Sequence, residues 1–382
     1  MTERKHRIPI KHSLPTALRQ IQLALDTRRH RFNRKCDPPA GKLSCGLIGA
    51  GDFFHYAYLP ALNRKTSPLQ ISGILTRNEK TFCAARAGLR YQTNRFADLK
   101  GLLNSGSRCV VILLPNNLHV EFTRMALAGG FHVFCEKPLA QNVADALVLK
   151  SVLQKSGRIL MVDFNERYLD RNRVLRNVIA TDRIGKIVSV HACHNQNLVP
   201  RLKSFAKLHR EITGGGVVHN AGIHFINLFL HWFGALEKVH AVFENRALPK
   251  DCGEDTARCR FWFRSGVTAT LETSLANAFP ASYECVRLVG EKGEIISDLK
   301  KSAIVGRLRT NQPLKIACKR EILSDSVFNA LEHFERCVRS GSSPETDIDD
   351  SIKTLKVIEA MTVSAQRGAE VLMNEIEKKY AC

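Results

Sequence analysis

The sequence lacks long hydrophobic runs: no stretch of about 18 or more apolar residues occurs along its 382 positions. A helix that crosses a bilayer needs such a run, so no membrane-spanning segment is predicted. The first residues, MTERKHRIPIKH, also lack the apolar core of a secretory signal. We therefore expect a cytoplasmic protein.

Cysteine is not scarce, but paired cysteine motifs are absent. The 12 cysteines include no C-x-x-C pair, and no Cys/His cluster has the spacing of a zinc finger. Scattered cysteines are typical of free thiols in a reducing compartment. The sequence therefore predicts neither a disulfide framework nor a metal ion.

Aromatic residues are few, at 7% of the chain, and no helix-turn-helix, zinc finger or aromatic-studded basic strand is evident. Nucleic acid is therefore not a predicted partner, although the formal net charge is +21. Residues 1–42 contribute +8 of this charge, from 11 basic and 3 acidic residues. A basic chain attracts anions of every kind, so charge alone identifies no partner.

Residues 1–42 are predicted to form a basic extension. Leu14, Leu18 and Ile21 recur at helical spacing, and CDPPAGK then breaks any helix and is typical of a linker. An organelle-targeting peptide, an arm that packs on a neighbouring subunit and a disordered tail are all consistent with this composition.

From residue 43 onward, apolar strand-like stretches alternate with helical ones. The strands include SCGLIGAG, CVVILLP and RILMVDF. This alternation is typical of βαβ units, so residues 43–163 are predicted to form an α/β domain with a parallel sheet. Residues 164–382 instead contain strand-like segments joined by short turns, followed by helices. They predict an α+β domain, for substrate binding and oligomerisation, with a large, mostly antiparallel open sheet.

A glycine turn follows the first strand, in CGLIGAGDFFHYAYLPAL. Gly49 permits a tight turn, and Gly51 lets a pyrophosphate approach the backbone at a helix start, as in Rossmann dinucleotide sites. Phe54 replaces the third glycine of G-x-G-x-x-G. Because that glycine mainly allows close packing of helix and strand, its loss is predicted to change packing more than phosphate binding.

The end of the second strand, GILTRNEK, lacks the acidic residue that binds the ribose hydroxyls in NAD sites. Thr76 and Arg77 stand there instead. A guanidinium beside a hydroxyl would bind the 2′-phosphate of NADP, whereas a carboxylate would repel it. The sequence therefore favours NADP, with NAD as the alternative if Arg77 is a solvated surface charge.

Further motifs follow in order along the chain. A P-N-x-x-H segment, a glycine-ended helix and an E-K-P motif occur in LLPNNLHVEFTRMALAGGFHVFCEKPLA. SGRILMVDFNERY, GGGVVHNAGIHFIN and LVGEKGEI come later. Jointly, over residues 43–375, these motifs resemble the Gfo/Idh/MocA family of nicotinamide-dependent oxidoreductases, whose first domain is a Rossmann fold.

The resemblance implies a set of cofactor-binding residues. They lie in the pyrophosphate turn, in the loop near the nicotinamide and in the E-K-P motif: Gly49, Gly51, Asp52, Phe53, Pro115, Asn116, His119, Glu136 and Lys137. Thr76 and Arg77 complete the predicted cofactor site at its ribose end.

The resemblance also implies the catalytic groups. In the family, an aspartate and a histidine four residues later follow the triple glycine; here Asn220 and His224 stand at those positions. A histidine with an ordinary pKa near ~6.5 suits removal of a hydroxyl proton at neutral pH. Lys137 would hold the substrate oxygen and Asn220 would orient the reacting groups. The alternative is that His224 is a core residue of the apolar helix that follows.

Four further residues are assigned to substrate binding. Arg167 and Tyr168 match a family position near the substrate cleft, with an interdomain ion pair as the alternative. Lys203 and Arg210 belong to a basic stretch that would bind a phosphorylated or nucleotide-linked sugar. A solvated helix face is the alternative for that stretch.

These observations predict an enzyme that transfers a hydride between nicotinamide and a secondary alcohol or ketone of a sugar, nucleotide-sugar or polyol. One alternative is a glycosidase-like enzyme that uses NAD transiently; the other is a non-catalytic cofactor-binding regulatory protein. The resemblance further implies a homodimer or homotetramer formed through the open face of the antiparallel sheet.

Overall fold

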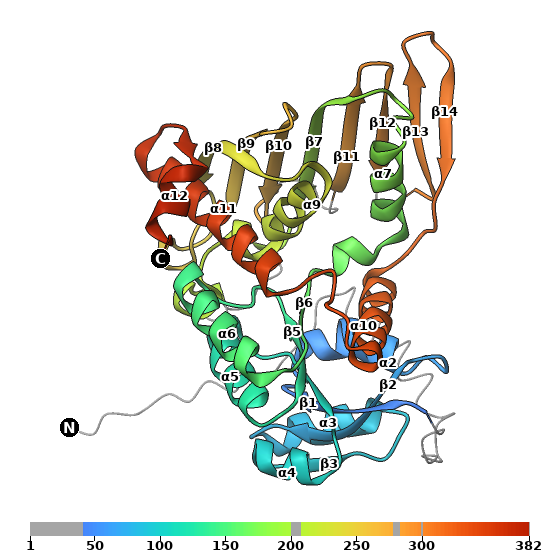
Figure 1. The fold of residues 1–382 in the computed structure, drawn as a ribbon, viewed down its shortest axis with the longest axis vertical. Helices are drawn as coiled ribbons and strands as arrows, with labels where there is room; N and C mark the ends of the chain where they lie inside the picture. Colours follow the sequence, from blue (N-terminus) through green and yellow to red (C-terminus); the bar gives the residue numbers. More distant parts are fainter. Residues whose placement is uncertain (1–40, 200–207, 278–282, 299–300, 382) are drawn as a thin grey trace, which may run out of the picture.

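The computed structural model describes residues 41–199, 208–277, 283–298 and 301–381. Lys203 and nearly all of the predicted basic extension lie outside these ranges. The described chain forms two sheets, one at each end of the molecule in Figure 1, with helices around and between them. Within the described ranges, no helix is long and apolar enough to cross a membrane.

The first sheet has six parallel strands in the order β3-β2-β1-β4-β5-β6. They are β1 (Leu43–Ile48), β2 (Leu69–Leu75), β3 (Asn94–Phe96), β4 (Cys109–Ile112), β5 (His132–Glu136) and β6 (Leu160–Asp163). The strand order reverses between β1 and β4, which is where open α/β sheets bind ligands at the carboxyl ends of their strands. The predicted Rossmann arrangement is confirmed.

Helices connect the strands of this sheet. They are η1 (Phe54–Tyr58), a π-helical turn continued by α2 (Leu59–Leu62), then α3 (Glu79–Gly88), α4 (Leu99–Asn104), the 3-10 turn η2 (Asn116–Leu118), α5 (His119–Ala128) and α6 (Val143–Ser156). Asn78 starts α3 because its Oδ1 accepts from the backbone N of Lys80 at 2.9 Å and of Thr81 at 3.3 Å. The sequence did not predict β3, since its three residues are largely exposed and carry no apolar pattern.

The second sheet has nine strands in the order β14-β13-β12-β11-β7-β10-β9-β8-β15. They are β7 (Ile187–Asn195), β8 (Leu236–Glu244), β9 (Thr256–Phe263), β10 (Thr268–Ser274), β11 (Tyr283–Gly290), β12 (Gly293–Asp298), β13 (Ala303–Leu308), β14 (Pro313–Ala317) and β15 (Val371–Leu372). Every neighbouring pair is antiparallel except β7 and β10. The predicted large, mostly antiparallel sheet is confirmed.

Helices cover one face of this sheet, as Figure 1 shows. The helical elements of this part are η3 (Asn165–Tyr168), α7 (Asp170–Ala180), α8 (Arg210–Thr213), the π-helical turn η6 (Val218–Gly222), α9 (Ile223–Phe233), η7 (Lys250–Cys252), α10 (Leu323–Ser340), α11 (Ile348–Arg367) and α12 (Met373–Lys379). The rings of Phe229 on α9 and Phe261 on β9 lie 5.9 Å apart. Alternate residues of β9, such as Arg258 and Arg260, are exposed on the other face, which stays open.

Helix α10 returns to pack on the first sheet. Val327, Leu331 and Phe334 join one buried apolar cluster with Phe54 of η1. The ring of Phe334 also lies 5.5 Å from that of Phe134 on β5. A division after residue 163 therefore separates the two sheets, whereas the core beneath the first sheet includes residues from the carboxyl-terminal part.

Candidate active site

The loop after β1 fits a dinucleotide pyrophosphate. Gly49 has φ +87°, and a Cβ built there would lie 2.7 Å from the carbonyl oxygen of Leu113, so the position requires glycine. A Cβ built on Gly51 would meet no described atom within 4 Å, which leaves room for a phosphate beside the backbone at the helix start. Asp52 and Phe53, the other predicted residues of this turn, are exposed.

Phe54 occupies the third-glycine position without blocking this turn. Its side chain is fully buried in the apolar cluster beneath the sheet. It is the first residue of η1, a π-helical turn. Such turns are rare and occur frequently at functional sites. The missing glycine therefore changes how the helix packs on the sheet, and leaves the backbone of Gly51 accessible.

Behind this turn, three buried oxygen-bearing side chains meet at the carboxyl ends of β5 and β6. Tyr58 Oη lies 2.7 Å from Glu136 Oε1 and 2.5 Å from Asp163 Oδ2. Glu136 and Asp163 are register partners on the two parallel strands, so their side chains lie side by side. We call Tyr58, Glu136 and Asp163 the carboxyl cluster. The sequence predicted only Glu136 among its members.

Tyr58 couples the charges of the carboxyl cluster. A tyrosine hydroxyl carries one hydrogen, so a proton on one carboxyl group lets both short contacts be hydrogen bonds. Burial and the neighbouring Glu136 raise the pKa of Asp163 well above its usual value. Burial also raises the pKa of Glu136, but the Lys137 ammonium opposes that rise. Asp163 is therefore the carboxyl group that favours the proton, and Glu136, beside Lys137, the one that favours the negative charge.

Lys137 links this cluster to the second half of the molecule. Its backbone N donates to Glu136 Oε2 at 3.1 Å, and its Nζ donates to the backbone carbonyl of Asn220 at 2.6 Å. Burial lowers the pKa of Lys137, while Glu136 and Asp163 oppose the change. The predicted E-K-P lysine thus reaches the predicted catalytic segment.

Asn220 and His224 lie on η6 and at the start of α9. The Asn220 side chain is exposed and the His224 side chain is half-buried. His224 Nδ1 is buried and has no hydrogen-bond partner among the described residues. Burial, with Lys137 and His194 nearby, lowers the pKa of His224 well below its usual value, so the imidazole is neutral at neutral pH. A buried polar atom without a partner suits a site that a bound molecule completes.

Two predicted cofactor residues hold loops in place. His119 is buried, with Nδ1 2.7 Å from the Pro138 carbonyl oxygen and Nε2 2.8 Å from that of Leu114. Burial lowers its pKa. Asn116 Nδ2 donates to the Thr213 carbonyl oxygen at 3.0 Å, and Pro115 precedes η2 as its cap. These contacts tie the P-N-x-x-H loop to the E-K-P segment and to α8.

The ribose end of the cofactor site is more exposed than the nicotinamide end. Arg77 is exposed, and its guanidinium makes no hydrogen bond or ion pair with the described residues. Arg95 on β3, which sequence reasoning missed, donates to the carbonyl oxygens of Thr76 at 3.2 Å and Arg77 at 2.9 Å. It also pairs with Glu79. The Arg95 guanidinium therefore braces this corner, whereas that of the exposed Arg77 is accessible to a ligand.

A buried charged network next to His224 also escaped the sequence analysis. His194 on β7 and Glu284 on β11 are register partners, with Nε2 and Oε2 3.6 Å apart. Arg171 on α7 pairs with Glu284 and, at 3.0 Å, with Glu166. Burial lowers the pKa of His194 to about 4. No motif joins these residues, because sheet register pairs His194 with Glu284 while α7 and η3 bring Arg171 and Glu166 to them.

Two of the predicted substrate-binding residues are bound by the protein itself. Arg167 Nε donates to Asn227 Oδ1 at 2.7 Å, and its Nη1 lies 2.9 Å from Asp350 Oδ2. Tyr168 is fully buried, with Oη 3.2 Å from Thr346 Oγ1. Arg167 is thus engaged in an ion pair rather than left open to a substrate, but its partner Asp350 also belongs to residues 164–382, so the pair does not join the two predicted domains. Arg210, in contrast, is exposed at the start of α8, and Lys203 lies outside the described residues.

The glycine turn at the switch point, with a lysine that reaches across to a second sheet domain, defines the class of an NAD(P)-dependent oxidoreductase. Comparison with known proteins agrees. Residues 43–164 match the oxidoreductase family with an NAD-binding Rossmann fold, GFO_IDH_MocA, and residues 172–296 match the GFO/IDH/MocA C-terminal domain. The chain belongs to the Gfo/Idh/MocA oxidoreductase family, as its motifs predicted.

Individual relatives are distant. D-xylose 1-dehydrogenase (NADP(+)) 2 of Haloferax volcanii is 25% identical over 328 residues, which cover 85% of this chain and 98% of the relative. The 2,7-anhydro-N-acetylneuraminate hydratase of Escherichia coli K12 is 30% identical, over 53% of this chain and 54% of its own length. The structure of aldose-aldose oxidoreductase from Caulobacter crescentus, complexed with glycerol, superposes with a TM-score of 0.76 at 23% identity, covering 87% and 99% of the two chains.

Proposed function

We propose that this oxidoreductase prefers NADP and acts on a secondary alcohol, or the corresponding ketone, of a sugar or related polyol. The observation that carries the proposal is the bond from Lys137 Nζ to the Asn220 carbonyl oxygen, 2.6 Å long. It brings the E-K-P lysine to the segment that carries His224, whose Nδ1 lacks a partner among the described residues. Kinship with a D-xylose dehydrogenase supports a carbohydrate substrate.

Each residue has a role in this scheme. Gly49 and Gly51 would hold the pyrophosphate, and Thr76 and Arg77 the phosphorylated ribose. The nicotinamide, when bound, supplies the hydride acceptor or donor. His224 is neutral and would accept the hydroxyl proton at a ring nitrogen.

Lys137 and Asn220 would act on the substrate directly. The Lys137 ammonium would hold the reacting oxygen, and the exposed Asn220 side chain would orient the substrate. Tyr58 and Asp163 act through Glu136: they keep one negative charge beside Lys137, which favours its ammonium form. They are therefore positioning residues.

The test uses oxidation of a panel of aldoses with NADP, followed by the absorbance of reduced nicotinamide. We expect turnover by the wild type, and Lys137→Ala to lower kcat by about 10² to 10⁴. The circular dichroism spectrum of this variant should match that of the wild type, which separates a catalytic role from misfolding. Lys137→Ala with unchanged kcat would overturn the proposed role.

A second candidate is an enzyme that oxidises and re-reduces its substrate with no net redox change. Similarity to a hydratase, at 30% identity, is the observation that favours this second candidate. The same experiment separates the two: product without accumulation of reduced nicotinamide supports transient redox. A purely regulatory role is less consistent with the chain, because Lys137 and His224 both retain a reactive arrangement.

Three further proposals concern the charge of the substrate, the assembly of the protein and its location. Arg210, exposed on α8 next to the cofactor loop, supports an anionic sugar as substrate.

On the open face of the nine-stranded sheet, Val242, Tyr283 and Ile296 are 43%, 46% and 38% exposed. Such a face suits a homodimer or homotetramer, and a monomer in sedimentation velocity would contradict this assignment. The ten cysteines of the described residues form no disulfide bond with one another, which supports a cytoplasmic location.

A further inference from the structure

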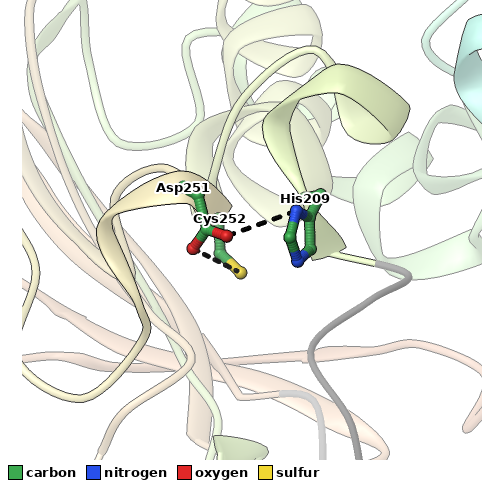
Figure 2. A group of neighbouring side chains, drawn as sticks. All are labelled: His209, Asp251 and Cys252. Carbon is green, nitrogen blue, oxygen red and sulfur yellow. Dashed lines mark hydrogen bonds and ion pairs between the residues drawn. The ribbon is translucent and has the colours of Figure 1, made fainter.

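Beside α8, three side chains of different chemistry point toward one another (Figure 2). His209 precedes α8, and Asp251 and Cys252 belong to η7. Their ligand atoms all lie within 4.8 Å of one another. His209 Nδ1 is 3.3 Å from Asp251 Oδ2, and Cys252 Sγ is 3.8 Å from Asp251 Oδ1. Imidazole, carboxylate and thiol together are a set of ligands that Zn²⁺ favours.

The separations fit a tetrahedral ion. Zn²⁺ binds imidazole nitrogen and carboxylate oxygen at about 2.0 to 2.2 Å and thiolate sulfur at about 2.3 Å. In a tetrahedron these bonds place nitrogen about 3.4 Å from the bound carboxylate oxygen. The observed separation of His209 Nδ1 and Asp251 Oδ2, 3.3 Å, is close to this value, and Cys252 Sγ approaches the other carboxylate oxygen, Oδ1, at 3.8 Å. We propose that His209, Asp251 and Cys252 bind one Zn²⁺ ion, with a fourth position open to water or another ligand.

The ligands come from two braced segments. Ile212 N and Thr213 N donate to the His209 carbonyl oxygen at 2.9 and 3.0 Å, which fixes the start of α8. Cys252 N donates to the Pro249 carbonyl oxygen at 3.0 Å, and the Cys252 side chain is only 1% exposed. The geometry therefore exists before an ion binds, and binding orders little additional chain.

Charge and protonation set the selectivity of the site. Binding of the ion to Cys252 breaks the S–H bond, forms a Zn–S bond and releases one proton to solvent. The thiolate and Asp251 together balance the two positive charges of the ion. Mg²⁺ and Ca²⁺ prefer oxygen ligands and should bind poorly.

The ion would brace the segment that carries the catalytic groups. A Cβ built on Gly253, next to Cys252, would lie 2.6 Å from the backbone N of Gly216. Glu254 Oε2 and Oε1 accept from the backbone N of Gly216 at 3.2 Å and of Val218 at 3.0 Å. The His209 side of the site leads directly into the same triple glycine. A bound ion would thus cross-link the segment around His209, which leads into η6, to the segment around Cys252, which packs against the same triple glycine.

Sequence patterns could not predict this site. Its ligands belong to segments far apart in the sequence, and no Cys/His spacing joins them. The site is also independent of the proposed sugar chemistry, because its occupancy can be measured on the protein alone.

The test is Co²⁺ titration of the full chain, stripped of metal and kept reduced. We expect one Co²⁺ per chain with a thiolate-to-cobalt charge-transfer band, and displacement by one equivalent of Zn²⁺. Cys252→Ser should abolish the band, and His209→Ala and Asp251→Asn should each weaken Zn²⁺ binding by at least about 100-fold. Circular dichroism checks that each variant is folded.

Cys83→Ser is the matched control. Cys83 Sγ lies 3.5 Å from Glu79 Oε1 and so forms a thiol–carboxylate pair without a histidine in the cluster. Its substitution should leave the band intact. No band in the wild type, a band that survives in Cys252→Ser, or one lost in Cys83→Ser would overturn the proposal.

Discussion

The two ends of the cofactor site differ in how firmly the protein holds their charges. At the nicotinamide end, Glu136 and Asp163 are buried and share Tyr58 as a partner. At the ribose end, Arg77 is exposed, with no partner among the described residues. A charge in a buried, hydrogen-bonded cluster interacts far more strongly than one that water screens. The chemical step is therefore expected to depend on the nicotinamide end, and the preference for NADP or NAD on the ribose end.

Packing explains the difference. The carboxyl cluster lies where η1 and α10 close over the ends of β5 and β6, and the ring of Phe334 on α10 contacts Phe134 on β5. The corner after β2 is bordered by the short, exposed β3. Variants at the two ends should therefore differ in the size of their effects.

The largest effect is expected within the carboxyl cluster itself. Glu136→Gln removes the negative charge beside Lys137, so kcat should fall by about 100-fold or more. Asp163→Asn keeps a neutral donor to Tyr58, as protonated Asp163 does, so kcat should stay within about tenfold of the wild type. The pH dependence of kcat in the two variants checks this order of effects, with circular dichroism as the control for folding. The reverse order of effects would assign the proton to Glu136.

Asp163→Asn is also expected to have a pH-dependent effect on the stability of the fold. The pKa of Asp163 is raised in the folded protein, so the folded state binds its proton more tightly than the unfolded state does. This carboxyl group therefore stabilises the fold least at neutral pH, once pH has risen above its unfolded pKa near ~3.9. The difference in Tm between Asp163→Asn and the wild type should shift in favour of the variant from pH 4 to pH 7. A difference that does not change with pH would contradict the raised pKa.

The smallest effect is expected at the ribose end. Arg77→Ala should raise the KM for NADP by about tenfold and leave the KM for NAD unchanged, because only NADP has the 2′-phosphate. Lys80→Ala is the matched control, since Lys80 is an exposed cation on the neighbouring α3. Equal changes for the two cofactors in Arg77→Ala would show that Arg77 does not select between them.

Contiguous motifs allowed much of this site to be predicted. Gly49, Gly51 and Lys137 each lie where a strand ends, and strand ends are visible in an apolar pattern. The partnership of Glu136 with Asp163 was not predictable, because it depends on the register of β5 against β6. Similarly, the motif around Arg167 left a cleft position and an ion pair as alternatives, and it did not indicate Asp350 as the partner.

Hydride transfer between a sugar carbon and nicotinamide C4, at the end of the site formed by Lys137 and His224, underlies every catalytic role proposed above. Incubation of NADP and a stoichiometric amount of enzyme with aldoses deuterated at the reacting carbon, followed by an alkaline quench and mass spectrometry of the cofactor, tests it directly. We predict that the reduced cofactor carries one deuterium. Product formation with no deuterium on the cofactor would contradict it.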